Sequence, residues 1–294
     1  MRLFDCFTFF NELDLLELRL RSLHDTVDHF VLAEAPVTFQ GQPKPLFYKE
    51  NERRFRPFAK KIIHVVVDDM PAGGDHWGRE YHQRNALKRG LQNAAPDDYV
   101  LVSDVDELIS KEAIAAASAH DALSFFEQRL AVYFLDWEVV GRPDGLWTKA
   151  YGAPKRLIDQ IENLSTPREQ CPAYFRSIGQ PFDNPVIPGA GWHFSWMGGV
   201  DSMLRKINAI ADTAEGLQVW KSPARLREAI ASKTFFAEGA RLVSVGLEDL
   251  PPVVQDNKNQ LRLKNMLSDE VSLNLKDRFR RKLRKFAARL FPGG

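Results

Sequence analysis

The chain has 294 residues, of which 44% are hydrophobic and 27% are charged, and its formal net charge at pH 7 is +1. This length and composition indicate a soluble globular protein that is long enough to bury a sizeable core. A net charge so close to zero excludes a protein that binds nucleic acid through the overall charge of the molecule.

The number and spacing of the cysteines and the N-terminal sequence indicate the cellular compartment of the protein. The chain has two cysteines, Cys6 and Cys171, and neither belongs to a CxxC motif. We expect both to be buried free thiols in a reducing environment rather than a disulfide framework. Acidic residues follow Met1 too closely for a secretory signal, and no apolar run approaches the roughly 20 residues of a membrane-spanning helix. We therefore expect a cytoplasmic protein.

Strands and helices alternate along the first hundred residues. Short apolar runs rich in β-branched and aromatic residues predict strands, and leucines at helical spacing predict helices. The predicted strands cover 3–10, 29–33, 61–67 and 99–103, and the predicted helices cover 12–23 and 78–93. This alternation predicts an α/β fold with a mostly parallel sheet and helices on both faces.

The remaining chain predicts smaller elements. An Ala-rich helix is expected over 111–122, a strand over 129–140 and another strand over 192–196. Residues 141–188 are rich in Pro, Gly and aromatic side chains, which is typical of loops with short strands. Residues 200–240 are expected to be helical.

Acidic side chains follow three of the predicted strands. Glu34 ends the second strand, Asp68 follows the third, and Asp104 and Asp106 follow the fourth. In open parallel sheets, ligands bind beyond the carboxyl ends of the strands. The sequence therefore predicts a polar cleft at this edge of the sheet.

Asp104 and Asp106 admit two interpretations. Side chains two residues apart in an extended segment point the same way, so both carboxylates could hold a divalent cation that also binds a nucleotide diphosphate. Alternatively, Ser103 or Asp104 could cap a helix that begins at Val105. The three-residue spacing alone favours neither interpretation.

Five longer stretches add a resemblance. The chain resembles glycosyltransferase family 17 in FDCFTFFNELDLLELRL, HFVLAEAPVTFQG, WGREYHQRNALKRGL, DDYVLVSDVDEL and GWHFSWMGG, which occur in family order over roughly residues 3–200. The resemblance implies a Rossmann-like GT-A fold, a nucleotide-sugar donor such as UDP-N-acetylglucosamine, a Mn²⁺ or Mg²⁺ cofactor and inversion at the sugar carbon. It implies a single domain over 1–240, with a nucleotide-sugar half (1–110) and an acceptor half (111–240).

The resemblance also implies roles for individual residues. Asp106 would bind the metal, Asp104 would bind the metal or the ribose, and Glu34 would lie near the nucleoside. His193 would be a further metal ligand, although a histidine among aromatic residues can equally be a core residue. The helix before the acidic strand would contact the donor through Arg79, Gln83, Arg84 and Asn85. Arg84 could instead extend its charged end to solvent over the core.

Inverting transfer requires a carboxylate base that lies within hydrogen-bond reach of the acceptor hydroxyl. Candidates after the acidic strand are Asp136, Glu138, Asp183, Asp201 and Glu238. We favour Glu138, with Asp201 as the next candidate, because burial of Glu138 in an aromatic strand would raise its pKa. The alternative interpretation is a solvated face of an edge strand.

A C-terminal extension (241–275) precedes a basic tail (276–294). Residues 276–290 hold eight basic residues and one acidic residue, with the apolar residues on one helical face. This pattern is typical of an amphipathic helix on an anionic membrane surface, and it would place the protein peripherally on the inner face of the membrane. A helix docked on the core and a disordered tail are the alternatives. Nucleic acid is not an expected partner, because no stacking platform accompanies the tail.

We expect a UDP-sugar donor and a glycan or glycolipid acceptor as partners. Two other functions remain open at this point. A nucleotidyltransferase uses a similar sheet, but the segment from Phe4 to Glu12 lacks a Gly-rich phosphate loop. A non-catalytic, membrane-associated scaffold could retain a transferase fold, and the presence of Asp104, Asp106 and His193 argues against it.

Overall fold

The computed structural model describes residues 1–268 except 74, 143–144, 219 and 236–239. The predicted basic tail and Glu238 lie outside the described residues. Within the described part of the chain, no helix is both long and apolar enough to cross a bilayer.

The larger sheet has seven strands in the order β10-β6-β9-β4-β1-β2-β3. The four strands predicted in the first hundred residues are present and pair in parallel, and β10 is parallel to β6, whereas β9 is antiparallel to both its neighbours. The strands are β1 (Leu3–Thr8), β2 (His29–Glu34), β3 (Ile62–Val66), β4 (Tyr99–Asp104), β6 (Ser124–Phe126), β9 (Tyr151–Pro154) and β10 (Val186–Ile187).

Helices cover both faces of this sheet because side chains along each strand alternate between two cores. In β1, Phe7 belongs to one core with the leucines of α1, whereas Phe4 and Cys6 belong to the other with Leu87. The first face carries α1 (Leu13–Leu23), α2 (Phe47–Glu50), the 3-10 helix η1 (Glu52–Phe58) and α4 (Lys111–Ser118). The second carries α3 (His76–Asn85), the 3-10 helix η2 (Ala86–Leu91) and α5 (Lys155–Ile158). The predicted α/β class is confirmed.

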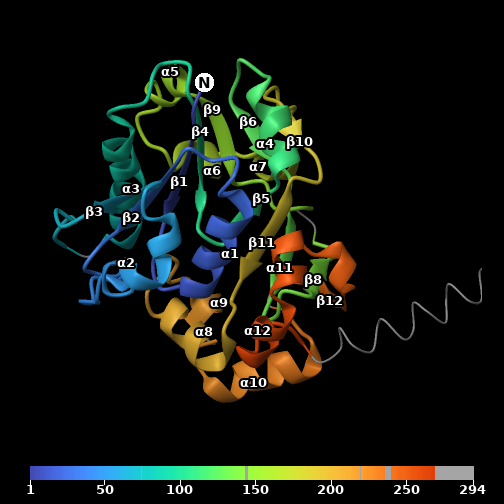
Figure 1. Cartoon of the computed structure of the whole chain (residues 1–294). Coiled ribbons are helices and arrows are strands. Elements are labelled where there is room, and N and C mark those ends of the chain that lie inside the picture. The colour runs from blue at the N-terminus through green and yellow to red at the C-terminus, as the bar shows by residue number, and fades with distance from the viewer. Residues whose placement is uncertain (74, 143–144, 219, 236–239, 269–294) are drawn as a thin grey trace, which may run out of the picture.

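A second sheet of five strands lies beside the first, in the order β12-β8-β7-β11-β5, and is mostly antiparallel (Figure 1). Its strands are β5 (Glu107–Ile109), β7 (Arg129–Val132), β8 (Trp137–Val140), β11 (Gly191–Ser195) and β12 (Arg241–Ser244). The predicted single strand over 129–140 is therefore wrong. The chain reverses between β7 and β8, where Tyr133 adopts a left-handed φ of 68°.

Short helices complete the fold. The segments α6 (Thr166–Glu169) and α7 (Pro172–Ser177) follow α5, while α8 (Gly199–Ile207), α9 (Glu215–Gln218) and α10 (Pro223–Ser232) fill the predicted helical region. Beyond β12 come the 3-10 helix η3 (Leu247–Asp249), α11 (Pro252–Asp256) and α12 (Lys258–Leu263). Residues of α11 share a core with Leu15 and Leu18 of α1, and Lys264 forms an ion pair with Asp14. The segment 241–268 thus packs against the beginning of the chain.

Candidate functional site

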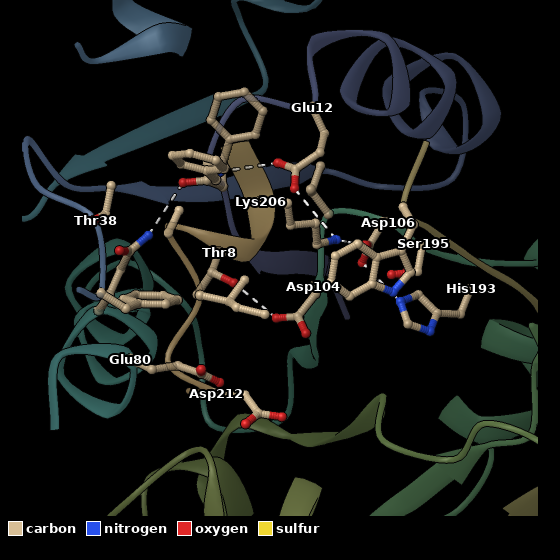
Figure 2. Close-up of a pocket in the computed structure, with 18 of the residues that line it drawn as sticks. Thr8, Glu12, Thr38, Glu80, Asp104, Asp106, His193, Ser195, Lys206 and Asp212 are labelled. Carbon is tan, nitrogen blue, oxygen red and sulfur yellow. Dashed lines mark hydrogen bonds and ion pairs between the residues drawn. The ribbon is translucent and has the colours of Figure 1, made fainter. Parts of the chain in front are cut away.

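A cleft of about 440 Å³ lies beyond the carboxyl ends of β1 and β4 (Figure 2). The two parallel strands pair in a register that places Thr8 beside Asp104, and the Thr8 hydroxyl donates a hydrogen bond to Asp104 Oδ1 at 2.9 Å. The loop around Val37–Lys44, α3, β11 and α8 supply further walls. The cleft lies where an open parallel sheet binds its ligands.

The acidic segment at the floor of the cleft is a tight turn between two strands. β4 ends at Asp104 and β5 begins at Glu107, so Val105 and Asp106 form the turn. The alternative of a helix that starts at Val105 is wrong. The next helix is α4, which is capped by Ser110, whose hydroxyl accepts from the amide of Ala113 at 3.2 Å.

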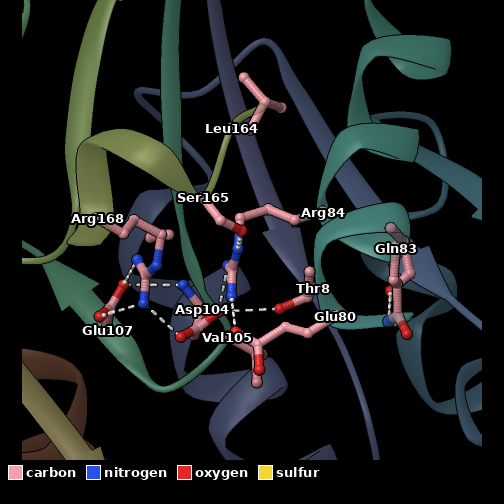
Figure 3. A network of polar contacts seen from close by, with 12 residues as sticks. Thr8, Glu80, Gln83, Arg84, Asp104, Val105, Glu107, Leu164, Ser165 and Arg168 are labelled. Atoms are coloured by element: carbon pink, nitrogen blue, oxygen red, sulfur yellow. Dashed lines mark hydrogen bonds and ion pairs between the residues drawn. The ribbon is translucent and has the colours of Figure 1, made fainter. Parts of the chain in front are cut away.

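Two arginines neutralise Asp104 from opposite sides (Figure 3). Arg84 Nη1 of α3 donates to Asp104 Oδ1 at 2.6 Å, and Arg168 Nη2 of α6 donates to Asp104 Oδ2 at 2.5 Å. Burial alone would raise the pKa of Asp104, but Arg168 and Arg84 outweigh it and hold that pKa well below its usual range. Asp104 is therefore a carboxylate in the folded protein.

Glu107 is the second carboxylate that Arg168 binds. Arg168 Nη1 lies 2.8 Å from Glu107 Oε2, and Arg168 Nη2 lies 3.1 Å from Glu107 Oε1. The indole N–H of Trp147 donates to Glu107 Oε1 at 2.5 Å. One buried guanidinium thus joins the carboxylates at the two ends of the turn, which explains how the like charges coexist.

Arg19 holds the backbone of the same turn. Its guanidinium is fully buried and forms an ion pair with Asp5 at 2.5 Å. It also donates to the backbone carbonyls of Asp104 at 2.9 Å and Glu107 at 2.8 Å. These contacts tie one guanidinium to the backbone at both ends of the turn, so Arg19 fixes the path of the chain through it.

Asp106 points into the cleft, toward a lysine and a histidine (Figure 2). Lys206 Nζ of α8 lies 2.9 Å from Asp106 Oδ2 and 3.8 Å from Glu12 Oε1. His193 Nε2 of β11 lies 3.4 Å from Asp106 Oδ1. Burial would raise the pKa of Asp106, but Lys206 and His193 lower it well below its usual range. Burial would lower the pKa of Lys206, but Asp106 and Glu12 raise it.

The side chains of the cleft offer some, but not all, of the ligands that a divalent cation needs. Within the described residues, no group of three or more His, Cys, Asp and Glu side chains is arranged to hold a metal. Both oxygens of Asp104 bind guanidinium groups, so the remaining ligand groups are His193 Nε2 and the carboxylate of Asp106, whose Oδ2 already contacts Lys206. Mg²⁺ commonly uses one or two carboxylates and completes its shell with water and phosphate oxygens. Asp106 and His193 are therefore the residues that could hold such a cation.

Of the other residues predicted to contact a donor, Gln83 is among the residues that line the cleft, whereas Arg79, Asn85 and Glu34 are not. Arg79 Nη1 donates to the carbonyl of Phe39 at 2.9 Å. Asn85 Oδ1 accepts from the amide of Leu164 at 2.8 Å. Glu34 is fully buried, accepts from the amide of Tyr48 at 2.9 Å and lies 3.1 Å from His64 Nε2.

Neither residue predicted as a base lines the cleft. Glu138 lies in β8 and accepts from Arg129 Nε at 2.7 Å, while Asp201 is exposed in the first turn of α8. Besides the two aspartates of the acidic turn, the carboxylates that line the cleft are Glu12, Glu80 and Asp212.

Three basic residues at the site were not predicted from the sequence. Arg168 and Lys206 come from short helices far along the chain from the acidic turn, and their local sequence carries no distinctive pattern. Arg19 could have been predicted from the sequence, because it lies three residues after Leu16 and four before Leu23, on the apolar face of α1. A charge on that face predicts a buried partner.

Comparison with known proteins finds similarity to one family model and to curated enzymes. Residues 1–142 match the model of glycosyltransferase family 17. The beta-1,4-mannosyl-glycoprotein 4-beta-N-acetylglucosaminyltransferase of Homo sapiens is 26% identical over 215 residues, which cover 63% of this chain and 39% of that protein. The Rattus norvegicus protein of the same name is also 26% identical over 215 residues, covering 63% and 38%. The chain thus spans about two fifths of the length of these curated relatives.

Among solved structures, the galactosyltransferase LgtC in complex with donor and acceptor sugar analogues is similar with a TM-score of 0.32 and 12% identity. The match covers 74% of this chain and 82% of that chain. A TM-score this low does not establish a common fold, so the fold assignment rests on the strand order and pairing described above.

Proposed function

We propose that the protein, whose residues 1–142 match the model of glycosyltransferase family 17, is a glycosyltransferase that moves a sugar from a nucleotide diphosphate to a hydroxyl of a glycan or glycolipid. The observation that carries the proposal is the acidic turn Asp104–Glu107 at the floor of a cleft beyond the carboxyl ends of parallel strands. The guanidinium groups of Arg19, Arg84 and Arg168 hold this turn in one geometry, as a preorganised phosphate-binding site requires.

We propose UDP-N-acetylglucosamine as the donor, in line with the name of the relatives, which are N-acetylglucosaminyltransferases. The cleft walls beside the end of β1 are aromatic and include Phe9, Phe10 and Phe39, which suit the flat face of a nucleoside base. Lys206 lies deeper in the cleft, beside Asp106, where its ammonium would attract the diphosphate.

Asp106 and His193 are the residues that would hold a Mn²⁺ or Mg²⁺ ion. When bound, the ion would stabilise negative charge on the departing diphosphate. Asp104 has a different role in this proposal, because its two arginines make it a structural anchor that fixes the turn. The charge of Arg84, at the wall of the cleft, would also act on a bound phosphate.

Inverting transfer needs a carboxylate base in the cleft, and Glu80 is the best placed. Glu80 Oε1 accepts from Arg84 Nη2 at 2.8 Å, and its Oε2 makes no hydrogen bond with the described residues. Glu12 is more engaged, because its Oε2 accepts from the amides of Phe10 and Asn11. We therefore propose Glu80, ahead of Glu138 and Asp201, as the group that accepts the proton of the acceptor hydroxyl.

The test of donor binding is a thermal shift with UDP and Mn²⁺, together and each alone. We expect the pair to raise the melting temperature more than the sum of the two separate shifts, because a ligand that binds only the folded state stabilises it by mass action. Asp106→Asn should abolish that excess. A panel of nucleotide sugars, followed by release of the nucleoside diphosphate, identifies the donor. No shift and no release with any donor would refute the proposal.

We also propose that residues 276–290 bring the enzyme to the inner face of an anionic membrane, where a lipid-linked glycan would be the acceptor. The support is compositional, since eight basic residues and one acidic residue lie within this segment. Near such a surface each basic residue contributes about 1 kcal/mol. A chain that lacks 276–294 should no longer sediment with phosphatidylserine vesicles, and unchanged sedimentation would contradict this part.

A further inference from the structure

One face of α3 runs from solvent into the cleft. Glu80, Tyr81 and Arg84 lie three, four and seven residues after Trp77, so the four residues share this face. Arg84 is buried against Asp104 and Glu80 lines the cleft, whereas 46% of the Trp77 side chain is exposed. By the helical rise, Trp77 lies about 4.5 Å along the axis from Glu80 and about 10 Å from Arg84.

The two aromatic residues of this face form a pair that is tied to α6 by a hydrogen bond. The ring centroids of Trp77 and Tyr81 lie 6.4 Å apart, with an angle of 38° between the ring planes. The Tyr81 hydroxyl donates to Glu169 Oε1 at 2.5 Å. Glu169 follows Arg168 in α6, so the residue that orients Tyr81 adjoins the residue that binds the acidic turn.

This hydrogen bond holds the Tyr81 ring in place. The carboxylate of Glu169 accepts the hydrogen bond and so stabilises the protonated phenol. This hydrogen bond, together with burial, raises the pKa of Tyr81 to about 12. Tyr81 is thus a neutral, oriented ring at physiological pH. A single exposed tryptophan is ordinary on a protein surface. An oriented aromatic pair on a helix face that continues into the cleft requires a further explanation.

We propose that Trp77 and Tyr81 form a platform on which a pyranose ring of the acceptor saccharide stacks. The electron-rich face of an aromatic ring attracts the weakly positive C–H groups on one side of a sugar, and contact removes apolar surface of both from water. A ring stacked here would place the following sugar of the chain beside Glu80. This inference rests on the proposed function and adds the acceptor side of the same site.

The experiment measures saccharide binding and donor turnover separately. The probe is 4-nitrophenyl β-D-mannopyranoside, followed by saturation-transfer NMR and by titration, with the full-length protein. The test variant is Trp77→Ala, and Trp77→Phe retains a smaller ring at the same position. The matched control is Tyr174→Ala, which removes another aromatic side chain that is 46% exposed but lies on α7, away from this face. Hydrolysis of UDP-N-acetylglucosamine without acceptor reports on the donor site.

We expect Trp77→Ala to weaken binding of the probe roughly three- to tenfold, in proportion to the loss of one aromatic contact. Trp77→Phe should weaken it less, and Tyr174→Ala should leave it unchanged. Donor hydrolysis and melting temperature should match the wild type in all three variants. Equal binding by wild type and Trp77→Ala, or no binding by the wild type, would overturn the platform while leaving the donor site intact. Absence of donor hydrolysis in the wild type would instead count against the proposed function.

Discussion

Replacement of Arg168 tests whether the acidic turn depends on its buried cation. Arg168 is the shared partner of Asp104 and Glu107, at distances of 2.5 to 3.1 Å. In Arg168→Leu, Glu107 keeps the indole N–H of Trp147 and Asp104 keeps Arg84, but Glu107 loses its only cation among the described residues. We expect the variant to fold with lower stability.

The size of the loss follows from burial. Removing one partner of a buried ion pair costs about 3–5 kcal/mol, because the other charge stays buried without compensation. For a domain of this size, such a loss lowers the melting temperature by about 10 °C. An exposed ion pair provides the contrast: Arg21, which is four residues from Glu17 on α1, should contribute about 0.5 kcal/mol.

The pH dependence of the unfolding free energy distinguishes the variant from the wild type. The pKa of Asp104 is depressed in the folded protein, so its contribution to stability is complete above the unfolded pKa of about 3.9 and is lost as the pH falls below that value. In Arg168→Leu, Asp104 keeps Arg84, whereas Glu107 stays buried without a cation, and its protonation at low pH would remove that unpaired charge. The deficit of the variant relative to wild type should therefore be largest at pH 7 and smaller near pH 4.

The assay is urea unfolding, followed by tryptophan fluorescence and circular dichroism, for wild type, Arg168→Leu and Arg21→Leu at both pH values. Two results would refute the reasoning. The first is an Arg168→Leu variant that is destabilised no more than Arg21→Leu at pH 7. The second is a deficit that grows as the pH falls.

Three further predictions follow from the same geometry. Lys206→Met should raise the KM for the donor roughly 10- to 100-fold through loss of a charge-assisted hydrogen bond, and an unchanged donor KM would exclude contact with the diphosphate. Glu80→Gln should lower kcat about 100-fold or more, and it should lose the bell-shaped pH profile that we expect of the wild type. A larger loss of kcat in Glu138→Gln would indicate that Glu138 of β8 is the base. Burial, with Asp5 adding to it, raises the pKa of the Cys6 thiol, so Cys6 should react with Ellman's reagent only at the rate of unfolding; fast reaction in the native protein would contradict its placement.

The sequence predicted the four parallel strands β1 to β4 of the larger sheet, because their signal is local, and it did not predict β6, β9 and β10. Each of the four parallel strands is a short run of apolar residues, and helices with leucines at helical spacing separate them. The division into β7 and β8 was missed because the reversal centres on Tyr133, and a tyrosine with a φ of 68° carries no turn signal in the sequence. The predicted helix 78–93 is α-helical only as far as Asn85, and the six residues that follow form the 3-10 helix η2, which hydrophobic spacing alone does not distinguish from an α-helix.

The part of the candidate site that was predicted from the sequence consists of residues in or directly after strands. The structure brings Asp104, Asp106 and His193 together in one cleft, and their roles toward a metal stay predictions. The partners Arg168 and Lys206 come from positions 64 and 100 residues after the aspartates they bind. Contacts across such separations depend on the packing of the whole fold, so no local pattern in the sequence identifies them.

The packing of 241–268 on the start of the chain has a consequence for synthesis. Lys264 pairs with Asp14, and the amide of Ser268 donates to Asp136 Oδ1 at 2.8 Å. A nascent chain on the ribosome can pair its four parallel strands early, but the smaller sheet gains its edge strand β12 only after residue 244 has emerged. Until then the outer edge of β8 stays open to other chains, which makes the interval before release the time at which this protein most needs a chaperone.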